Sequence, residues 1–186
     1  MDDSVKAVFL DRDGVINEFP GYGKYVTGPK EFHFLPGSIE AVRKLKENDF
    51  KLFIVSNQQG VAKGLYSLKD LKAIDRKMLS GFKKKKTSVD GIFYCTHLAE
   101  EDCACRKPKT GLLTQALSGS VLRRSSSFFV GDSMIDMQTA QAMEIKSVLV
   151  LSGREKIAER NGWSFNPDFI FDNLLLAAHY ICAHAK

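Results

Sequence analysis

Two acidic residues flank an arginine in the stretch FLDRDGVIN, directly after the apolar run AVFL. Asp11 and Asp13 are therefore expected at the end of a buried strand, where side chains can reach a ligand. Carboxylates in such a place can attack an electrophile, move a proton or bind a metal ion. The tetrapeptide DRDG by itself is also compatible with an ordinary acidic turn. Other parts of the chain must decide between these interpretations.

Two further apolar runs end at polar residues in the same manner. LFIV is followed by Ser56 and Asn57, and FFV is followed by Gly131 and Asp132. Open α/β sheets bind ligands in the crevice at the carboxyl ends of their parallel strands. We therefore expect residues that are distant in the sequence to converge on one site. The predicted set is Asp11, Asp13, Ser56, Asn57, Asp132 and Asp136.

Carboxylates from two strands cannot share such a crevice without a cation. Two unit charges about 4 Å apart repel by about 4 kcal/mol at an effective dielectric constant of roughly 20, and Asp11 and Asp132 would face this penalty. Ligation by a few carboxylates and a phosphate suits Mg²⁺, which holds octahedral geometry and keeps several waters. The sequence thus predicts Mg²⁺ at this site.

Four metal-ligating side chains gather in one short segment: Cys95, His97, Cys103 and Cys105. Disulfide frameworks spread their cysteines along the chain, whereas clustering in a reducing compartment indicates metal. Three thiols and an imidazole suit tetrahedral zinc, and a site closed by four protein ligands is structural. Incidental cysteines in a loop are the alternative. Cys182 lies apart in an apolar segment and is interpreted as a core residue.

Short apolar runs alternate with helical patterns along the chain. The runs predict buried strands over residues 5–10, 51–55, 91–95, 127–130 and 147–151. Ser38 and Ser67 are expected as N-caps of two helices. The apolar side of the second helix is predicted to consist of Leu68, Leu71, Met78, Leu79 and Phe82. Further helices are expected over residues 108–117, 134–143 and 173–185.

Strands that alternate with helices imply a parallel sheet covered on both faces. We therefore predict an α/β protein, a three-layer sandwich with a mainly parallel central sheet. The length of 186 residues and a hydrophobic content of 44% fit one domain. Residues 14–35 and 95–109 remain as long irregular stretches, and loops of such length are usually functional or disordered.

The composition argues against a membrane protein. No segment approaches the eighteen or so consecutive apolar residues of a membrane span, and MDDSVKAVFLDRD opens with acids where a signal peptide carries bases. We expect a cytoplasmic protein with no membrane partner. The net charge of +5 is compatible with an anionic substrate, nucleic acid or solubility alone. The lysines at residues 83–86 lack interleaved aromatic residues and are interpreted as a solvated helix end.

Four motifs in order carry a resemblance to a known family: DRDGVIN, SNQQGVAKG, CRKPKTG and VGDSMIDMQTA. They resemble the motifs of the haloacid dehalogenase (HAD) superfamily of phosphohydrolases, over residues 5 to 151. The stretch CTHLAEEDCACRKP resembles the zinc loop of its histidinol-phosphate and heptose-bisphosphate phosphatase branch. The resemblance implies a Rossmann-like fold without a large cap domain. It also implies one domain over residues 1–186, with a zinc loop at 95–105 before Lys107.

The resemblance assigns roles to the acids. Asp11 is the implied nucleophile, which forms an aspartyl-phosphate intermediate with the substrate. Asp13 is the implied general acid and base, and its backbone carbonyl would bind Mg²⁺ together with Asp11 and Asp132. Asp136, one helical turn beyond Asp132, would support the ligands without touching the metal.

The resemblance also implies which groups hold the substrate. Ser56, the backbone at Asn57 and the Lys107 ammonium would bind the phosphoryl oxygens, and Arg106 could clamp phosphate in bidentate fashion. A pair of surface bases before Pro108 is the alternative for Arg106 and Lys107. The zinc loop would hold these two residues over the crevice. The sugar side would contact Phe19, Pro20, Gly21, Tyr22, Ser56, Asn57, Gln58 and Gln59.

The implied activity is that of a Mg²⁺-dependent phosphatase with structural zinc. The stretches NQQGVAKGLYS and INEFPGY are similar to the heptose branch, which implies a phosphorylated sugar, hydrolysed at the 7-phosphate of a heptose 1,7-bisphosphate. A histidinol-phosphate phosphatase is the nearest alternative. Two others are a polynucleotide 3′-phosphatase, which should lack the zinc loop, and a non-catalytic zinc-stabilised binding module. We expect a monomer that binds no nucleic acid.

Two positions depart from the heptose pattern. Ser133 stands where that branch often has lysine, and Glu144 stands where glycine is expected after a helix. Glu144 is interpreted as a change at the helix end without catalytic meaning.

Overall fold

The computed structural model describes residues 4–155, 163 and 166–185. Within these residues the strands form one sheet in the order β3-β2-β1-β4-β5-β6, and every neighbouring pair is parallel. The strands are β1 (Ala7–Leu10), β2 (Lys51–Asn57), β3 (Gly91–Cys95), β4 (Phe128–Gly131), β5 (Lys146–Val150) and β6 (Phe169–Phe171). The predicted α/β fold with a parallel sheet is confirmed.

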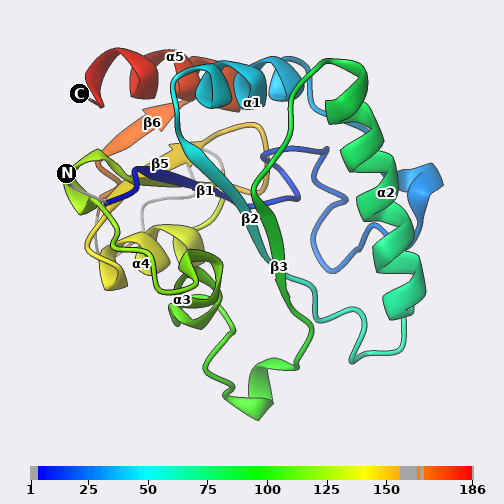
Figure 1. The fold of residues 1–186 in the computed structure, drawn as a ribbon. Coiled ribbons are helices and arrows are strands. Elements are labelled where there is room, and N and C mark those ends of the chain that lie inside the picture. The colour runs from blue at the N-terminus through cyan, green and yellow to red at the C-terminus, as the bar shows by residue number, and fades with distance from the viewer. Residues whose placement is uncertain (1–3, 156–162, 164–165, 186) are drawn as a thin grey trace.

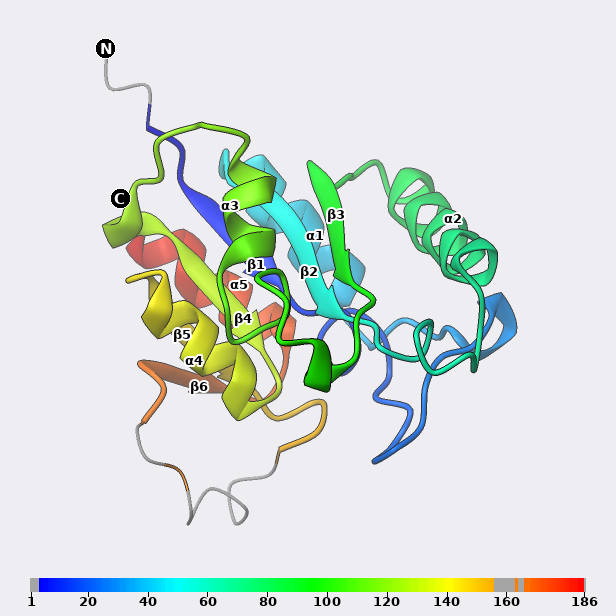
Figure 2. The same cartoon turned by 90° about the horizontal axis from the view of Figure 1, so that it is seen from below.

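Helices cover both faces of this sheet (Figures 1 and 2). They are α1 (Ser38–Glu47), α2 (Leu68–Lys84), α3 (Gly111–Leu117), α4 (Met134–Ala142) and α5 (Leu174–His184), with short 3-10 turns at Pro29–Glu31, Ala99–Glu101 and Arg124–Ser126. In the figures, α1 and α5 lie together on one face, α3 and α4 lie on the other, and α2 stands beside the β3 edge. The three predicted layers are present.

The central strands are apolar on both faces because each face is covered. In β1, Val8 and Leu10 belong to the core under α1 and α5, whereas Ala7 and Phe9 belong to the core under α3 and α4. All four side chains are fully buried. A strand covered on both sides reads as a continuous apolar run, which is why AVFL, LFIV and FFV could be recognised in the sequence.

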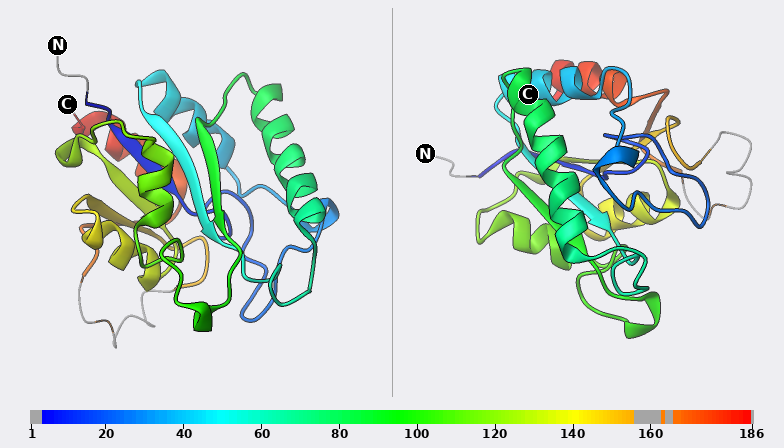
Figure 3. Two further views of the ribbon diagram at one scale, coloured as in Figure 1. Left: turned by 60° about the horizontal axis from the view of Figure 1, so that its bottom comes forward. Right: turned by 90° about the vertical axis from the view of Figure 1, so that its right-hand side faces the viewer.

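The loops that follow β1, β2 and β3 leave the sheet at the same end (Figure 3). The first contains Gly14 with a φ of 84°, in the left-handed region that favours glycine. This turn lets the chain fold back at once, since the Gly14 amide donates to the Asn17 carbonyl. The acids of DRDG are therefore held at the strand end.

The second predicted helix start is confirmed and the first is wrong. Ser67 caps α2, accepting from the Asp70 amide while Asp70 accepts from Ser67. For α1 the N-cap is Gly37, with a φ of 78°, and Ser38 is the first helical residue. Glycine takes this position because the chain enters α1 through a left-handed conformation that serine adopts at a cost.

Other expectations also need correction. Leu68 and Leu79 of α2 are 56% and 41% exposed, because Leu71, Ile74, Met78 and Phe82 form the buried face. Strand β6 was not expected, since it has three half-buried residues. Helix α3 begins at Gly111, later than the predicted residue 108. Cys182 is half-buried and packs against the core.

The lysines at residues 83–86 are all exposed at the end of α2, as predicted for a solvated helix terminus. Among the described residues, no helix is both long and apolar enough to cross a membrane.

Candidate active site

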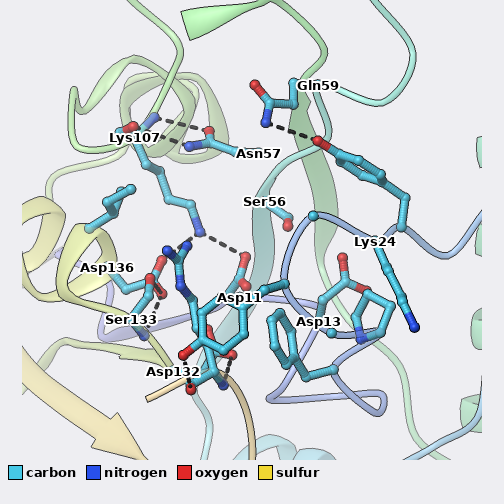
Figure 4. Close-up of a pocket in the computed structure, with 18 of the residues that line it drawn as sticks. Asp11, Asp13, Lys24, Ser56, Asn57, Gln59, Lys107, Asp132, Ser133 and Asp136 are labelled. Carbon is cyan, nitrogen blue, oxygen red and sulfur yellow. Dashed lines mark hydrogen bonds and ion pairs between the residues drawn. The ribbon is translucent and has the colours of Figure 1, made fainter. Parts of the chain in front are cut away.

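A cavity of about 310 Å³ opens at the carboxyl ends of β1, β2 and β4. Figure 4 shows Asp11, Asp13, Ser56, Asn57, Lys107, Asp132 and Asp136 around it. The acids thus converge from separate strand ends, as predicted. The expected substrate contacts also line this cavity, and Gln58 is the exception among them. Those in the lining are Phe19, Pro20, Gly21, Tyr22, Ser56, Asn57, Gln59, Arg106 and Lys107.

Lys107 lies at the centre of the acidic cluster. Its Nζ donates to Asp11 Oδ1 at 2.7 Å, to Asp136 Oδ1 at 2.6 Å and to the Val55 carbonyl at 3.0 Å. The ammonium group is buried, so these three acceptors replace its water shell. Burial alone would lower the pKa of Lys107, but the carboxylates of Asp11 and Asp136 outweigh it and raise that pKa above its usual value. Lys107 is a fixed positive charge.

Asp132 faces the same cavity from the end of β4. Its Oδ2 accepts from the Arg154 amide at 2.7 Å. A Cβ added at Gly14 or Gly153 would lie 2.0 Å from this oxygen, so two glycines give the carboxylate its room. Burial, together with the charges of Asp11 and Asp136, raises the pKa of Asp132 well above its usual value.

Three buried carboxylates therefore lie around one ammonium group, which contacts two of them. Oxygens of Asp11, Asp132 and Asp136 lie within 4.8 Å of one another. Burial is the largest influence that raises the pKa of Asp11 to about 6, and Lys107 opposes it only in part. Excess negative charge with all-oxygen donors is the environment that binds Mg²⁺. The residues present fit this ion.

Asp136 is engaged on both of its oxygens. Besides the contact with Lys107, its Oδ2 accepts from Ser133 Oγ at 2.6 Å and from the Ser133 amide at 3.2 Å. This is the capping box at the start of α4. Asp136 is thereby fixed as a partner of Lys107, and Ser133 has a structural role at the position where the resemblance led us to expect lysine.

The Asp13 carboxylate is surrounded by donors. Arg12 contributes Nε at 3.1 Å and an amino nitrogen at 2.9 Å from each oxygen, Asn17 Nδ2 lies at 2.8 Å and Gln58 Nε2 at 2.9 Å. The Arg12 side chain is fully buried and Asp13 retains 20% exposure. Asp13 is thus held firmly while one side of it reaches the cavity.

Asn57 and Arg106 tie the second strand end to the cysteine loop. The Asn57 side chain donates to the Lys107 carbonyl and accepts from the Lys107 amide, both at 3.1 Å. Arg106 donates to Gln59 Oε1 and to the His97 carbonyl, both at 3.3 Å. The backbone that carries Lys107 is therefore positioned by Asn57.

The four expected zinc ligands form one cluster. Cys103 Sγ lies 3.5 Å from Cys95 Sγ and 3.3 Å from Cys105 Sγ, and His97 Nδ1 lies 3.2 Å from Cys105 Sγ. Tetrahedral ligands about 2.0–2.3 Å from zinc are separated by roughly 3.5–3.8 Å. The donor set and its spacing fit zinc. The three cysteines of the cluster form no disulfide.

The outer wall of the cavity contains cations that the sequence analysis missed. Tyr25 OH accepts from Gln59 Nε2 at 3.0 Å and from Lys63 Nζ at 3.3 Å. Lys24 and Arg154 also line the cavity, and Tyr22 OH donates to the Arg154 carbonyl at 3.0 Å. Lys24 and Lys63 lie in the glycine-containing stretches GYGKY and GVAKG, a signal that could have identified them; Arg154 carried none.

Gln58 was expected to touch the substrate, and the structure places it elsewhere. Its side chain is 2% exposed and lies outside the lining of the cavity. It turns inward because its amide has buried partners in Asp13, Ser56 and Tyr66. Gln58 therefore contacts Asp13, the expected general acid and base, and does not face the cavity.

Comparisons with known proteins find relatives that are similar in sequence and in fold. The model of the HAD-hydrolase-like family matches residues 104–177. The D-glycero-β-D-manno-heptose-1,7-bisphosphate 7-phosphatase of Helicobacter pylori is 38% identical over 78% of this chain and 83% of its own length. The Campylobacter jejuni enzyme, named for the α anomer, is 38% identical over 81% of this chain and 85% of its own.

A solved structure is similar over nearly the whole chain. The D,D-heptose 1,7-bisphosphate phosphatase of B. bronchiseptica, complexed with magnesium and phosphate, has a TM-score of 0.89 and 31% identity, covering 97% of this chain and all of that one. The fold and the acidic cavity define a phosphatase of the HAD superfamily. The chain belongs to the heptose-1,7-bisphosphate 7-phosphatase family within it.

Proposed function

We propose that this chain is a Mg²⁺-dependent phosphatase that hydrolyses the 7-phosphate of D-glycero-D-manno-heptose 1,7-bisphosphate. The observation that carries the proposal is the placement of Asp11. It lies at the end of β1, paired with Lys107 and facing Asp132 across a cavity. A carboxylate held between a fixed ammonium and a metal site is positioned to attack a phosphoryl group.

In the first step an Asp11 carboxylate oxygen forms a bond to phosphorus as the bond from phosphorus to the ester oxygen breaks. The electron pair goes to the departing sugar oxygen, which takes a proton from Asp13. Ser56 and the backbone at Asn57 would donate to the phosphoryl oxygens, and the Lys107 ammonium would supply a nearby positive charge, because the charge on these oxygens must be matched by fixed groups. The product is an aspartyl phosphate on Asp11.

In the second step Asp13, now ionised, takes a proton from water. The water oxygen forms a bond to phosphorus while the bond to Asp11 breaks, which releases phosphate and restores both acids. The donors around Asp13 hold its carboxyl group in place for this step.

Two metal ions fit the chain. Asp11, Asp132 and the Asp13 backbone carbonyl would hold Mg²⁺, which neutralises the phosphate and the clustered carboxylates. Cys95, His97, Cys103 and Cys105 would hold zinc, which stabilises the loop at residues 95–105 within a single domain over residues 1–186. Asp136 would support Lys107 without binding the metal, since both of its oxygens have other partners.

The charges around the cavity favour a substrate with a second anionic group. Lys24, Lys63, Arg106 and Arg154 line it beyond the acidic centre. A bisphosphate gains from these cations, whereas the ammonium group of histidinol phosphate would be repelled. A polynucleotide would need a continuous basic groove, and the lysines at residues 83–86 lie on the end of α2. We propose a monomer with a small-molecule substrate.

Steady-state rates on heptose 1,7-bisphosphate, histidinol phosphate and a 3′-phosphorylated oligonucleotide test the proposal. The bisphosphate should have the highest kcat/KM. Asp11→Asn and Asp13→Asn should each lower turnover by at least about a hundredfold, with circular dichroism unchanged. A preference for another substrate would overturn the substrate assignment. Substantial activity of Asp11→Asn on phosphomonoesters in general would overturn the mechanism. Absence of turnover by the wild type on every ester would leave the non-catalytic binding module as the alternative.

A further inference from the structure

Gln58 connects the general acid to the rest of the site. Arg12 and Asn17, the other donors to Asp13, belong to the same turn as Asp13. Gln58 comes from the end of β2, and its Nε2 lies 2.9 Å from Asp13 Oδ2 and 3.2 Å from Ser56 Oγ. The side-chain amide of Gln58 therefore donates both to Asp13, after β1, and to the Ser56 hydroxyl on β2, which is proposed to bind phosphate.

The orientation of this amide is determined by Tyr66. A tyrosine hydroxyl that donates to the amide must face its oxygen, and Tyr66 OH lies 2.6 Å from Gln58 Oε1. The nitrogen of the amide then points to Asp13. Burial raises the pKa of Tyr66 to about 12, so its proton is retained at neutral pH.

The main chain of Gln58 is fixed as well. Its amide donates to the Cys95 carbonyl at 2.7 Å. Both Gln58 and Tyr66 are buried, with 2% and 6% exposure, so neither side chain can turn toward water. A Cβ at Gly60 would lie 2.3 Å from Tyr66 Cε1, which shows how closely the Tyr66 ring packs on the backbone after Gln58.

We propose that Gln58, oriented by Tyr66, is a positioning residue that holds the Asp13 carboxyl for proton transfer. This inference rests on the proposed function, in which Asp13 protonates the departing oxygen and later deprotonates water. The role assigned to Gln58 differs from substrate contact, since it acts through Asp13. The loss of Gln58 should harm the steps in which Asp13 moves a proton and spare the attack by Asp11.

Two esters that differ in their need for a proton separate this role from a structural one. The sugar oxygen of heptose bisphosphate leaves poorly without protonation, whereas 4-nitrophenyl phosphate has a leaving group that departs unaided. The ratio kcat/KM reports the steps up to and including departure of the alcohol or phenol of the ester. The constant kcat also includes hydrolysis of the aspartyl phosphate. Gln58→Met removes the donor and keeps the length of the side chain.

We expect Gln58→Met to lower kcat/KM for the bisphosphate by about tenfold, a fraction of the usual contribution of general acid catalysis. With 4-nitrophenyl phosphate, kcat/KM should stay within about twofold while kcat and KM fall together, because water activation by Asp13 is slowed. Tyr66→Phe should give the same pattern more weakly. This variant provides the test if Gln58→Met does not fold. Gln115→Leu and Tyr180→Phe, at sites remote from the cavity, serve as matched controls and should behave as the wild type.

Equal losses of kcat/KM on both esters, or no loss on either, would overturn the positioning role of Gln58. Asp13→Asn distinguishes that outcome from failure of the proposed function, since it should show the same ester dependence in stronger form. If Asp13→Asn lacks this dependence, or the wild type hydrolyses neither ester, the mechanism and the inference both fail. If only the Gln58 and Tyr66 variants lack it, the inference alone fails.

Discussion

Lys107 Nζ lies 2.7 Å from Asp11 Oδ1 where both groups are almost completely buried. The same nitrogen contacts Asp136, so one positive charge serves two carboxylates, and Asp132 adds a third. The acidic centre therefore carries an excess of negative charge. This imbalance has consequences for stability that can be measured without substrate.

In buffer without Mg²⁺, Asp11 should make the folded state less stable as the pH rises. Its pKa is about 6 in the folded chain against an ordinary 3.8, so the folded state keeps a proton that the unfolded chain has released. The stabilising contribution is complete below the ordinary value and is lost as the pH rises through about 6. A shift of this size corresponds to about 3 kcal/mol.

The measurement is the free energy of unfolding of the wild type and Asp11→Asn at roughly pH 4.5 and pH 7. The variant should gain relative to the wild type at the higher pH, since asparagine has no proton to lose. Saturating Mg²⁺ should reduce this difference. A difference between the two proteins that does not change with pH would contradict the prediction.

Cys103→Ser should lose zinc, because Cys103 Sγ is in contact with the sulfurs of both Cys95 and Cys105. The loop at residues 95–105 also supports Arg106 through the His97 carbonyl, so we expect turnover to fall with the zinc. Elemental analysis of the purified proteins gives the metal content. Cys182→Ser is the matched control, because the Cys182 thiol packs against the core under α1 and α5. This variant should retain zinc. An unaltered zinc content in Cys103→Ser would refute the ligand assignment.

Gly153→Ala should weaken Mg²⁺ binding. Its Cβ would lie 2.0 Å from Asp132 Oδ2, so the carboxylate must move. We expect the Mg²⁺ concentration for half-maximal activity to rise by about tenfold, equivalent to about 1.4 kcal/mol. Gly28→Ala is the control, since nothing lies within 4 Å of its added Cβ. Equal Mg²⁺ requirements in the two variants would show that Asp132 does not need the space.

Glu144→Gly should stabilise the protein. Glu144 has a φ of 56° after α4, in the left-handed region where a side chain costs about 1–2 kcal/mol. Its ion pair with Arg124 is exposed and contributes little. Allowing for the entropy of glycine, the free energy of unfolding should rise by about 0.5–1 kcal/mol in chemical denaturation. Glu144→Ala keeps the strain and should show no such gain; a similar gain in Ala would refute the conformational explanation.

Much of the fold could be predicted because its signals are local. Strands β1 to β5 are apolar runs, and the Ser67 capping box is defined by neighbouring residues. The errors arose where the exposure of a side chain or the start of a helix depends on residues that are close in space. Leu79 fits the helical spacing of α2, yet the packing of that helix leaves it exposed. Gly37 replaces Ser38 as the cap because the direction of entry into α1 depends on the preceding turn.

The amino-acid sequence by itself determined the parallel α/β fold, the convergence of Asp11, Asp13 and Asp132, and the clustering of Cys95 with Cys103. These follow from short-range patterns and from the rule that parallel strands end at one edge. Only the tertiary structure decided that Gln58 turns inward to Asp13, that Asp136 shares Lys107 with Asp11, and that Lys24, Lys63 and Arg154 line the cavity. The physical reason is that these contacts join segments far apart in the chain, so the direction of each side chain depends on the packing of the whole fold.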